Sequence, residues 1–287
     1  MRWSLELGRI AGTAVRVHVT FLLFLAFIGI LVYRANGPEA AWDSLAFIIL
    51  IFICVVAHEF GHVLMARRFG ARTRDVTLFP IGGVANIEHL PEKPSQEILV
   101  ALAGPLVNLV IAVVIMLWFG HSLDNEDFNS LGNIETSLAL RIAAANLILM
   151  TFNLLPAFPM DGGRVLRALI SLKWGRTRAT RIAAGIGQIF AFALGFAGLF
   201  GNPLLIIIAA FIFIAAGGEA DAAALHDSAR DLTVGEAMLT NYSAFHPSDT
   251  IGTCIENLIR SSDEIFPVVD EASRPFGFVT RNALIHA

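Results

Sequence analysis

The chain has 287 residues, of which 56% are hydrophobic and only 15% charged, and its mean hydropathy is +0.69. A soluble globular domain does not carry so apolar a composition, so the chain is expected to lie in a lipid bilayer. The net charge of −4 leaves no excess of basic residues, which argues against a nucleic-acid-binding protein. Two cysteines, Cys54 and Cys254, fall in an apolar and a polar region respectively, and no disulfide between them is expected.

Six apolar segments follow one another within residues 1–218, near 17–33, 45–66, 97–119, 139–157, 182–200 and 203–218. Most approach the ~20 residues that a helix needs to cross the hydrocarbon core of a bilayer. The first resembles a secretory signal because arginines precede it, but no small-residue cleavage site follows it. We therefore predict an all-α, multi-pass membrane protein with about six transmembrane helices.

Lysine and arginine are divided unevenly between the two sides of this arrangement. One side holds the N-terminus and the connections after the second and fourth helices, which carry most of the basic residues. The other side has only Arg34 and Arg141, and its loop 120–136 is acidic. The positive-inside rule then places both termini in the cytoplasm, in a cell membrane of the bacterial inner-membrane type.

The second apolar segment ends in the pattern His58-Glu59-Phe60-Gly61-His62. Positions i and i+4 share one face of a helix, so both imidazoles can bind one metal ion. Glu59 would lie beside the metal, where it could deprotonate a bound water. Ionisable groups are costly in a membrane helix, so three within five residues favour a site over two core histidines bonded to carbonyls.

A zinc site with two histidines requires a third protein ligand and an open position for water. Asp161 is expected at the same membrane depth, where Pro156 and Pro159 interrupt the fourth helix. The alternative is a capping or turn residue before Gly162-Gly163. Asn153, about two turns earlier, could donate to a developing oxyanion or only bridge two helices.

Two other stretches differ from membrane helices. Residues 76–87 combine β-branched side chains with Gly82-Gly83, which predicts a membrane-associated β-hairpin, with a plain cytoplasmic hairpin as the alternative. After a polar, alanine-rich helical linker at 219–230, residues 231–287 alternate helix and strand patterns, at 234–239, 250–260, 265–270 and 275–280. This small α/β domain is too short for a large core and is expected to need a partner.

These motifs together resemble the site-2 protease family of intramembrane zinc metalloproteases. The resemblance rests on HExxH in the second helix, Gly104-Pro105-Leu106-Val107-Asn108 in the third, and Asn153, Pro156 and Asp161-Gly162 in the fourth. It implies that His58, His62 and Asp161 bind one zinc ion, that Glu59 is the general base and that Asn153 assists at the oxyanion. Asn108 is carried over only as a family marker. The implied substrates are transmembrane regulators such as anti-sigma factors.

The tail from residue 231 resembles a single cystathionine-β-synthase (CBS) motif. Such motifs normally pair and often bind adenine nucleotides, so the resemblance implies either a truncated tail or a homodimer formed through it, with an adenine nucleotide as a ligand. Two other functions stay open on the sequence. A metal-ion transporter would not need Glu59 beside His58, and a non-catalytic helix-binding protein would not need the complete zinc set.

Overall fold

The computed structural model of the protein describes residues 3–88, 93–119, 137–230, 233–238, 240, 242–261, 263–272 and 274–286. The chain divides into two compact units, Met1–Asp227 and Ser228–Ala287. This division falls inside the predicted linker 219–230. The predicted acidic loop 120–136 and positions 231, 232, 239, 241, 262, 273 and 287 of the predicted tail lie outside the described residues.

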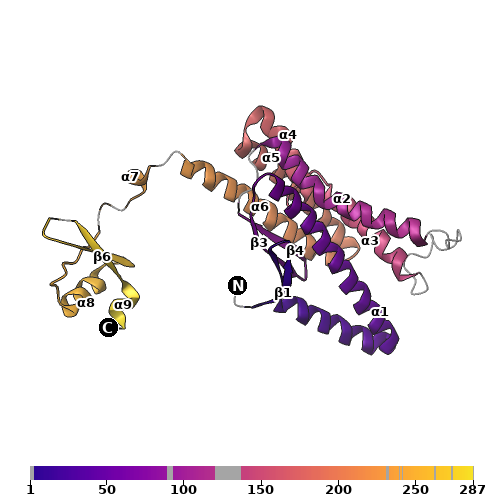
Figure 1. Cartoon of the computed structure of the whole chain (residues 1–287), viewed down its shortest axis with the longest axis horizontal. Helices are drawn as coiled ribbons and strands as arrows, with labels where there is room; N and C mark the ends of the chain where they lie inside the picture. Colours follow the sequence, from indigo (N-terminus) through magenta and orange to yellow (C-terminus); the bar gives the residue numbers. More distant parts are fainter. Residues whose placement is uncertain are drawn as a thin grey trace. The chain divides into compact units, whose positions relative to one another are not determined.

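The first unit combines a small sheet with long helices (Figure 1). Its elements are β1 (Ser4–Ile10), β2 (Thr13–His18), α1 (Val19–Arg68), β3 (Thr73–Phe79), β4 (Gly82–Ile87), α2 (Pro94–Phe119), α3 (Leu138–Asn153), α4 (Asp161–Trp174), α5 (Arg176–Phe200) and α6 (Leu204–Arg230). The second unit consists of α7 (Val234–Ala237), α8 (Ile251–Arg260), β5 (Ile265–Val269), β6 (Pro275–Thr280) and α9 (Arg281–Ile285).

Helices α1, α2, α5 and α6 are each long and apolar enough to cross a membrane, and α3 is a shorter apolar helix of 16 residues. The six predicted apolar segments fall largely within these helices, although the fourth, 139–157, runs beyond the end of α3. Large apolar side chains on α5 and α6 point outward, including Phe192, Phe200 and Ile214, which are at least 73% exposed. Such faces suit contact with lipid tails, as a multi-pass membrane protein requires.

Helix α1 has 50 residues and would be about 75 Å long if straight, far more than a bilayer's hydrocarbon core. It is interrupted at Gly37, which has a φ of 86° and precedes Pro38. The Phe21 ring packs against the Phe52 ring at a centroid distance of 4.4 Å, so the two arms fold back on each other (Figure 1). The arms contain the first two predicted segments, 17–33 and 45–66.

The sheet has the strand order β1-β2-β3-β4 and extends the predicted hairpin. The hairpin itself is confirmed, since β3 and β4 pair antiparallel, with Phe79 opposite Gly82. The N-terminal residues form a second hairpin, which the sequence analysis did not predict, and β2 pairs parallel with β3. Val15 and Val76 of this sheet pack against Phe60 of α1. The sheet therefore fixes the part of α1 that carries the histidine pattern.

The predicted fourth helix, 139–157, ends earlier than expected. Helix α3 stops at Asn153, and residues 154–160, which include a cis peptide bond between Phe158 and Pro159, connect it to α4. Phe158 is fully buried against Ala183, Ala184 and Ala216 of α5 and α6. The prolines cannot continue the helix, and the buried segment lets the chain restart at Asp161 as α4, which the sequence analysis did not separate from the loop.

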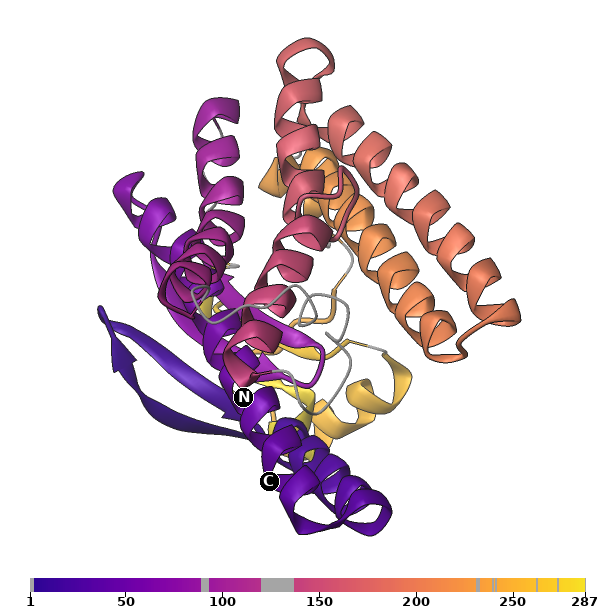
Figure 2. The same ribbon diagram turned by 90° about the vertical axis from the view of Figure 1, so that its right-hand side faces the viewer.

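Helices α5 and α6 lie side by side, joined by a short connection at residues 201–203 (Figure 2). Small residues make this approach close: a Cβ on Gly195 would lie 3.3 Å from that of Ala209, and one on Gly187 would lie 3.2 Å from that of Ala216. Close packing of this kind is typical of membrane helices. Helix α6 continues through the predicted helical linker to Arg230.

The second unit is small. Strands β5 and β6 pair antiparallel, and a buried cluster of Phe245, Cys254, Leu258, Phe266 and Leu284 holds α8 and α9 against them. The predicted helix and strand positions from 250 to 280 agree with α8, β5 and β6. The other face of α8 leaves Ile251 and Ile259 more than half exposed.

Candidate metal centre

His58 and His62 lie on one face of α1, four residues apart, and both side chains are buried. Their ring planes are nearly perpendicular, at 81°, and their Nε2 atoms are 3.0 Å apart. The Nδ1 atom of His62 lies 2.8 Å from the carbonyl oxygen of Val100 on α2, which makes it the N–H donor to that carbonyl. This bond fixes the tautomer and leaves Nε2 of His62 free to act as a ligand.

Asp161 joins the two histidines from the other half of the chain. It is the first residue of α4, buried, and its Oδ2 atom lies 3.2 Å from Nε2 of His58 and 3.1 Å from Nε2 of His62. Three ligand atoms therefore converge within 3.2 Å of one another from positions 99 and 103 residues apart in the chain. The alternative in which Asp161 merely caps a turn does not account for this convergence.

The separations of these atoms fit a zinc ion. Zinc–nitrogen and zinc–oxygen bonds of about 2.05 Å at tetrahedral angles put neighbouring ligand atoms about 3.3 Å apart. The pairwise distances of 3.0–3.2 Å are close to that edge length. Two imidazoles and a carboxylate are also a donor set that zinc uses in catalytic sites, where three protein ligands leave one position open.

Gly104 on α2 allows the two imidazoles to occupy this space. A Cβ at this position would lie 2.6 Å from Cε1 of His62 and 2.7 Å from Nε2 of His58. Any side chain there would have to displace the imidazoles. The two imidazoles can occupy these positions only because Gly104, the first residue of the Gly-Pro-Leu-Val-Asn element, has no side chain.

Glu59 lies beside the cluster, half-buried on the same turn of α1. A Cβ on Gly83 of β4 would be 2.7 Å from the Cγ of Glu59, so the edge strand of the sheet passes directly against this side chain.

Asn153 is the last residue of α3 and is half-buried. Among the described residues, the structure records no hydrogen bond from its amide to the cluster. Asn108 is buried one turn beyond Gly104.

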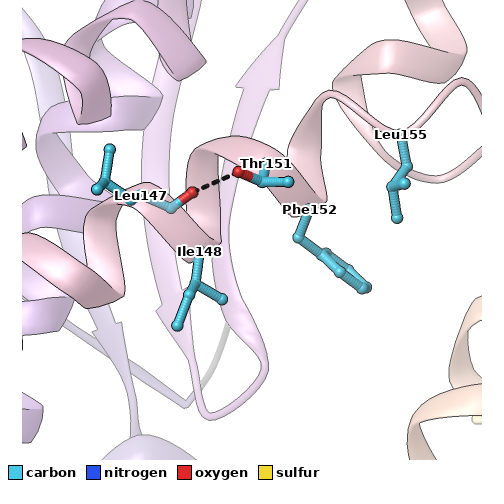
Figure 3. A pocket seen from close by; sticks show the side chains of 5 residues that line it. All are labelled: Leu147, Ile148, Thr151, Phe152 and Leu155. Atoms are coloured by element: carbon cyan, nitrogen blue, oxygen red, sulfur yellow. Dashed lines mark hydrogen bonds between the residues drawn. The ribbon is translucent and has the colours of Figure 1, made fainter. Parts of the chain in front are cut away.

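An apolar pocket of about 330 Å³ lies along α3, lined by Leu147, Ile148, Thr151, Phe152 and Leu155. Figure 3 shows Ile148, Phe152 and Leu155 projecting in the same direction. The Thr151 hydroxyl donates to the carbonyl of Leu147 at 2.8 Å, so it is satisfied within the helix. The lining of the pocket is therefore mainly apolar, and its last residue in the chain, Leu155, comes two residues after Asn153.

Residues 46–133 and 127–197 match the sequence profile of peptidase family M50. This chain belongs to peptidase family M50. The matched residues include the histidine pattern, Gly104, Asn153 and Asp161, and they span α1 after its kink through most of α5.

The M50 peptidase has similar relatives over most of its length. A zinc metalloprotease of Methanocaldococcus jannaschii is 32% identical over 271 residues, which are 94% of this chain and 76% of the relative. The Rip3 protein of Mycobacterium tuberculosis is 34% identical over 236 residues, 76% of this chain and 59% of Rip3. The solved structure of a site-2 protease from Methanocaldococcus jannaschii is 36% identical, with a TM-score of 0.58, and covers 76% of this chain and 95% of its own.

These similarities establish the M50 peptidase as a multi-pass membrane zinc metalloprotease and decide among the three functions left open by the sequence. The three residues that sequence reasoning proposed as metal ligands, His58, His62 and Asp161, are gathered in one place, and Glu59 follows His58 on the same turn of α1, against Gly83. Sequence reasoning did not predict the bond from His62 to the Val100 carbonyl, the approach of Gly104 to the imidazoles or the approach of Gly83 to Glu59. It also did not predict the packing partners of α4, such as Glu97 of α2. Main-chain contacts of this kind leave no periodic pattern that a sequence could show.

Proposed function

We propose that the M50 peptidase binds its zinc ion through Nε2 of His58, Nε2 of His62 and Oδ2 of Asp161, and that Glu59 is the general base. The observation that carries this proposal is the convergence of three buried ligand atoms within 3.2 Å, beside a carboxylate on the next residue of the same helix. A bound zinc ion supplies Lewis-acid polarisation of the scissile carbonyl and lowers the pKa of a coordinated water.

The protein side chains then handle the proton and the developing charge. The Glu59 carboxylate takes the proton from the attacking water and returns it to the leaving amine. The Asn153 amide is suited to donate a hydrogen bond to the developing oxyanion, as the family resemblance implies. An unchanged turnover number in Asn153→Ala would remove this role from Asn153.

We propose that the substrate is a transmembrane segment of a membrane-bound regulator, such as an anti-sigma factor, cut within or near the membrane. A peptide bond inside a helix is shielded by its own hydrogen bonds, so the substrate has to unwind locally. Strand β4 is the outer strand of the sheet and runs past Glu59 at Gly83. An extended substrate segment that adds to this edge would lie beside the metal centre.

We propose that both termini lie in the cytoplasm, because most basic residues fall on that side of the predicted arrangement. A reporter that is active only in the cytoplasm, fused after residue 287, tests this orientation, and an inactive fusion that is present in the membrane would contradict it.

The tail is proposed to be a CBS-like motif that pairs with a second copy and binds an adenine nucleotide. The 94% coverage of this chain by the 32%-identical relative takes in most of the tail. Exposed apolar side chains on α8 and β6, with Ile259 at 75% and Phe276 at 78%, provide a surface that a second copy can cover. A protein that stays monomeric in detergent with and without ATP would contradict the pairing, and the absence of ATP binding in equilibrium dialysis would contradict the nucleotide site.

Removing the metal tests the proposed function directly. The purified protein, reconstituted with a membrane-anchored reporter substrate, is expected to produce transmembrane-segment fragments that mass spectrometry detects. Treatment with a zinc chelator should abolish these fragments, and added Zn²⁺ should restore them. Fragments that persist at the native rate after zinc has been removed would contradict a zinc peptidase, whereas zinc flux without any cleavage would favour a transporter.

A further inference from the structure

We propose that the buried ion pair between Glu97 and Arg167 is a positioning device that holds the two halves of the metal centre together. Nε of Arg167 donates to Oε1 of Glu97 at 2.7 Å, and a terminal guanidinium nitrogen lies 2.6 Å from the same oxygen. Both side chains are only 5–6% exposed. Removing two charges from water is unfavourable, and only close, well-oriented contacts between them offset this desolvation penalty.

Each partner belongs to a helix that supplies one half of the site. Glu97 lies in the first turn of α2, one turn before Val100, whose carbonyl accepts the hydrogen bond from His62. Gly104, further along α2, lies against both imidazoles. Arg167 lies on α4, six residues after Asp161 and about 9 Å along the helix axis from it. The ion pair thus links the helix that orients the histidines to the helix that presents the carboxylate.

Arg167 also contacts the segment that leads into Asp161. Its guanidinium lies 5.0 Å from the ring centroid of Phe158, and the backbone N–H of Phe158 donates to the carbonyl of Ala183 at 3.3 Å. On the far side, a third guanidinium nitrogen lies 3.7 Å from a carboxylate oxygen of Glu219. Arg167 therefore contacts α2, α6 and the turn before Asp161, which restricts how far the Asp161 end of α4 can move from the histidines.

The geometry of the pair requires arginine and not simply a positive charge. A guanidinium presents two donors in a fixed plane and also stacks on an aromatic ring, whereas the lysine ammonium is a compact point charge on a flexible chain. Lysine at position 167 is expected to keep the charge balance and lose one of the two close contacts with Glu97 together with the contact over the Phe158 ring.

The test measures zinc release, because a role limited to stability would not change it in protein that is still folded. This inference rests on the proposed zinc ligands. Purified, zinc-loaded protein is mixed with an excess of a colorimetric chelator, and the folded fraction is followed by circular dichroism. Arg167→Gln is expected to release zinc at least tenfold faster than the native protein, and Arg167→Lys to fall between them.

Arg141→Gln is the matched control. It breaks another short ion pair, in which Arg141 of α3 donates to Asp43 of α1 at 2.6 Å, about four helical turns along α1 from His58. Zinc release from this variant should stay at the native rate. Equal acceleration in both variants would show a general loss of packing and overturn the positioning role.

Two further variants keep the outcome decisive. If Arg167→Gln does not fold, the double variant Glu97→Gln/Arg167→Gln removes both charges and leaves two amides, and the same acceleration is expected from it. Native zinc release from any folded variant without Arg167 overturns the inference. Asp161→Ala tests the ligand assignment separately, since native zinc retention in that variant would contradict the proposed function itself.

Discussion

Replacing Glu59 by glutamine is expected to abolish peptide cleavage while the protein keeps its zinc. Glutamine has nearly the same shape as glutamate, so it can occupy the space beside Gly83, but it cannot accept the proton of the attacking water. General acid–base catalysis typically contributes about 10²–10⁴-fold, and cleavage should fall by that factor. The rate is measured on the reconstituted reporter substrate, and zinc is measured by elemental mass spectrometry.

Glu6→Gln provides the matched control, because Glu6 pairs only with Arg9 and Arg16 among the described residues, near the N-terminal edge of the sheet. This variant makes the same chemical change and should cleave at the native rate. Proteolysis at a near-native rate by Glu59→Gln would contradict the assignment of Glu59. Loss of zinc along with activity would assign it to metal binding instead.

Gly104→Ala is expected to remove most of the bound zinc. The added methyl group would lie within 2.7 Å of atoms in both imidazoles, so the histidines must move away from each other or from Asp161. Because the Val100 carbonyl also holds His62 in place, the rings have little room to shift together. We expect zinc affinity to fall by ~10–100-fold, which is the typical loss when a residue that positions a metal ligand is replaced. Competition with a chelator of known affinity measures it.

Gly185→Ala is the control for the helix substitution itself. Among the described residues, no atom outside the neighbouring backbone of α5 lies within 4 Å of a Cβ at Gly185, and alanine favours a helix by roughly 1 kcal/mol over glycine. This variant should bind zinc as the native protein does. If Gly104→Ala also keeps native affinity, the close approach of α2 to the imidazoles does not constrain the site.

The proposed metal ligands and base were all named from the sequence because helical spacing and membrane cost act locally. His58 and His62 follow from the i, i+4 rule, and Glu59 is adjacent to the first. Asp161 needed a further step, the expectation of equal membrane depth, and the structure brings it within 3.2 Å of both histidines. What holds these ligands in place could not be predicted, because the Val100 carbonyl and the Gly104 approach depend on how α2 crosses α1.

The N-terminal hairpin shows a different limit. Strand β2 is held by parallel pairing with β3, for example Val15 with Val76, across the whole length of α1. Such pairing between distant residues is set by tertiary structure, which local propensity does not report. Strand β1 leaves Leu5 and Leu7 more than half exposed, so it does not show the usual pattern of one buried face either. Helix α4 was not predicted, because Pro156 and Pro159 before it indicated the start of a loop.

The most direct test of the account is an anomalous difference map from crystals of the native protein, collected at the zinc absorption edge. The account predicts a peak between Nε2 of His58, Nε2 of His62 and Oδ2 of Asp161, at about 2.0–2.2 Å from each atom. The peak should remain in Glu59→Gln. A zinc peak elsewhere in the chain, with none among these three side chains, would contradict the account.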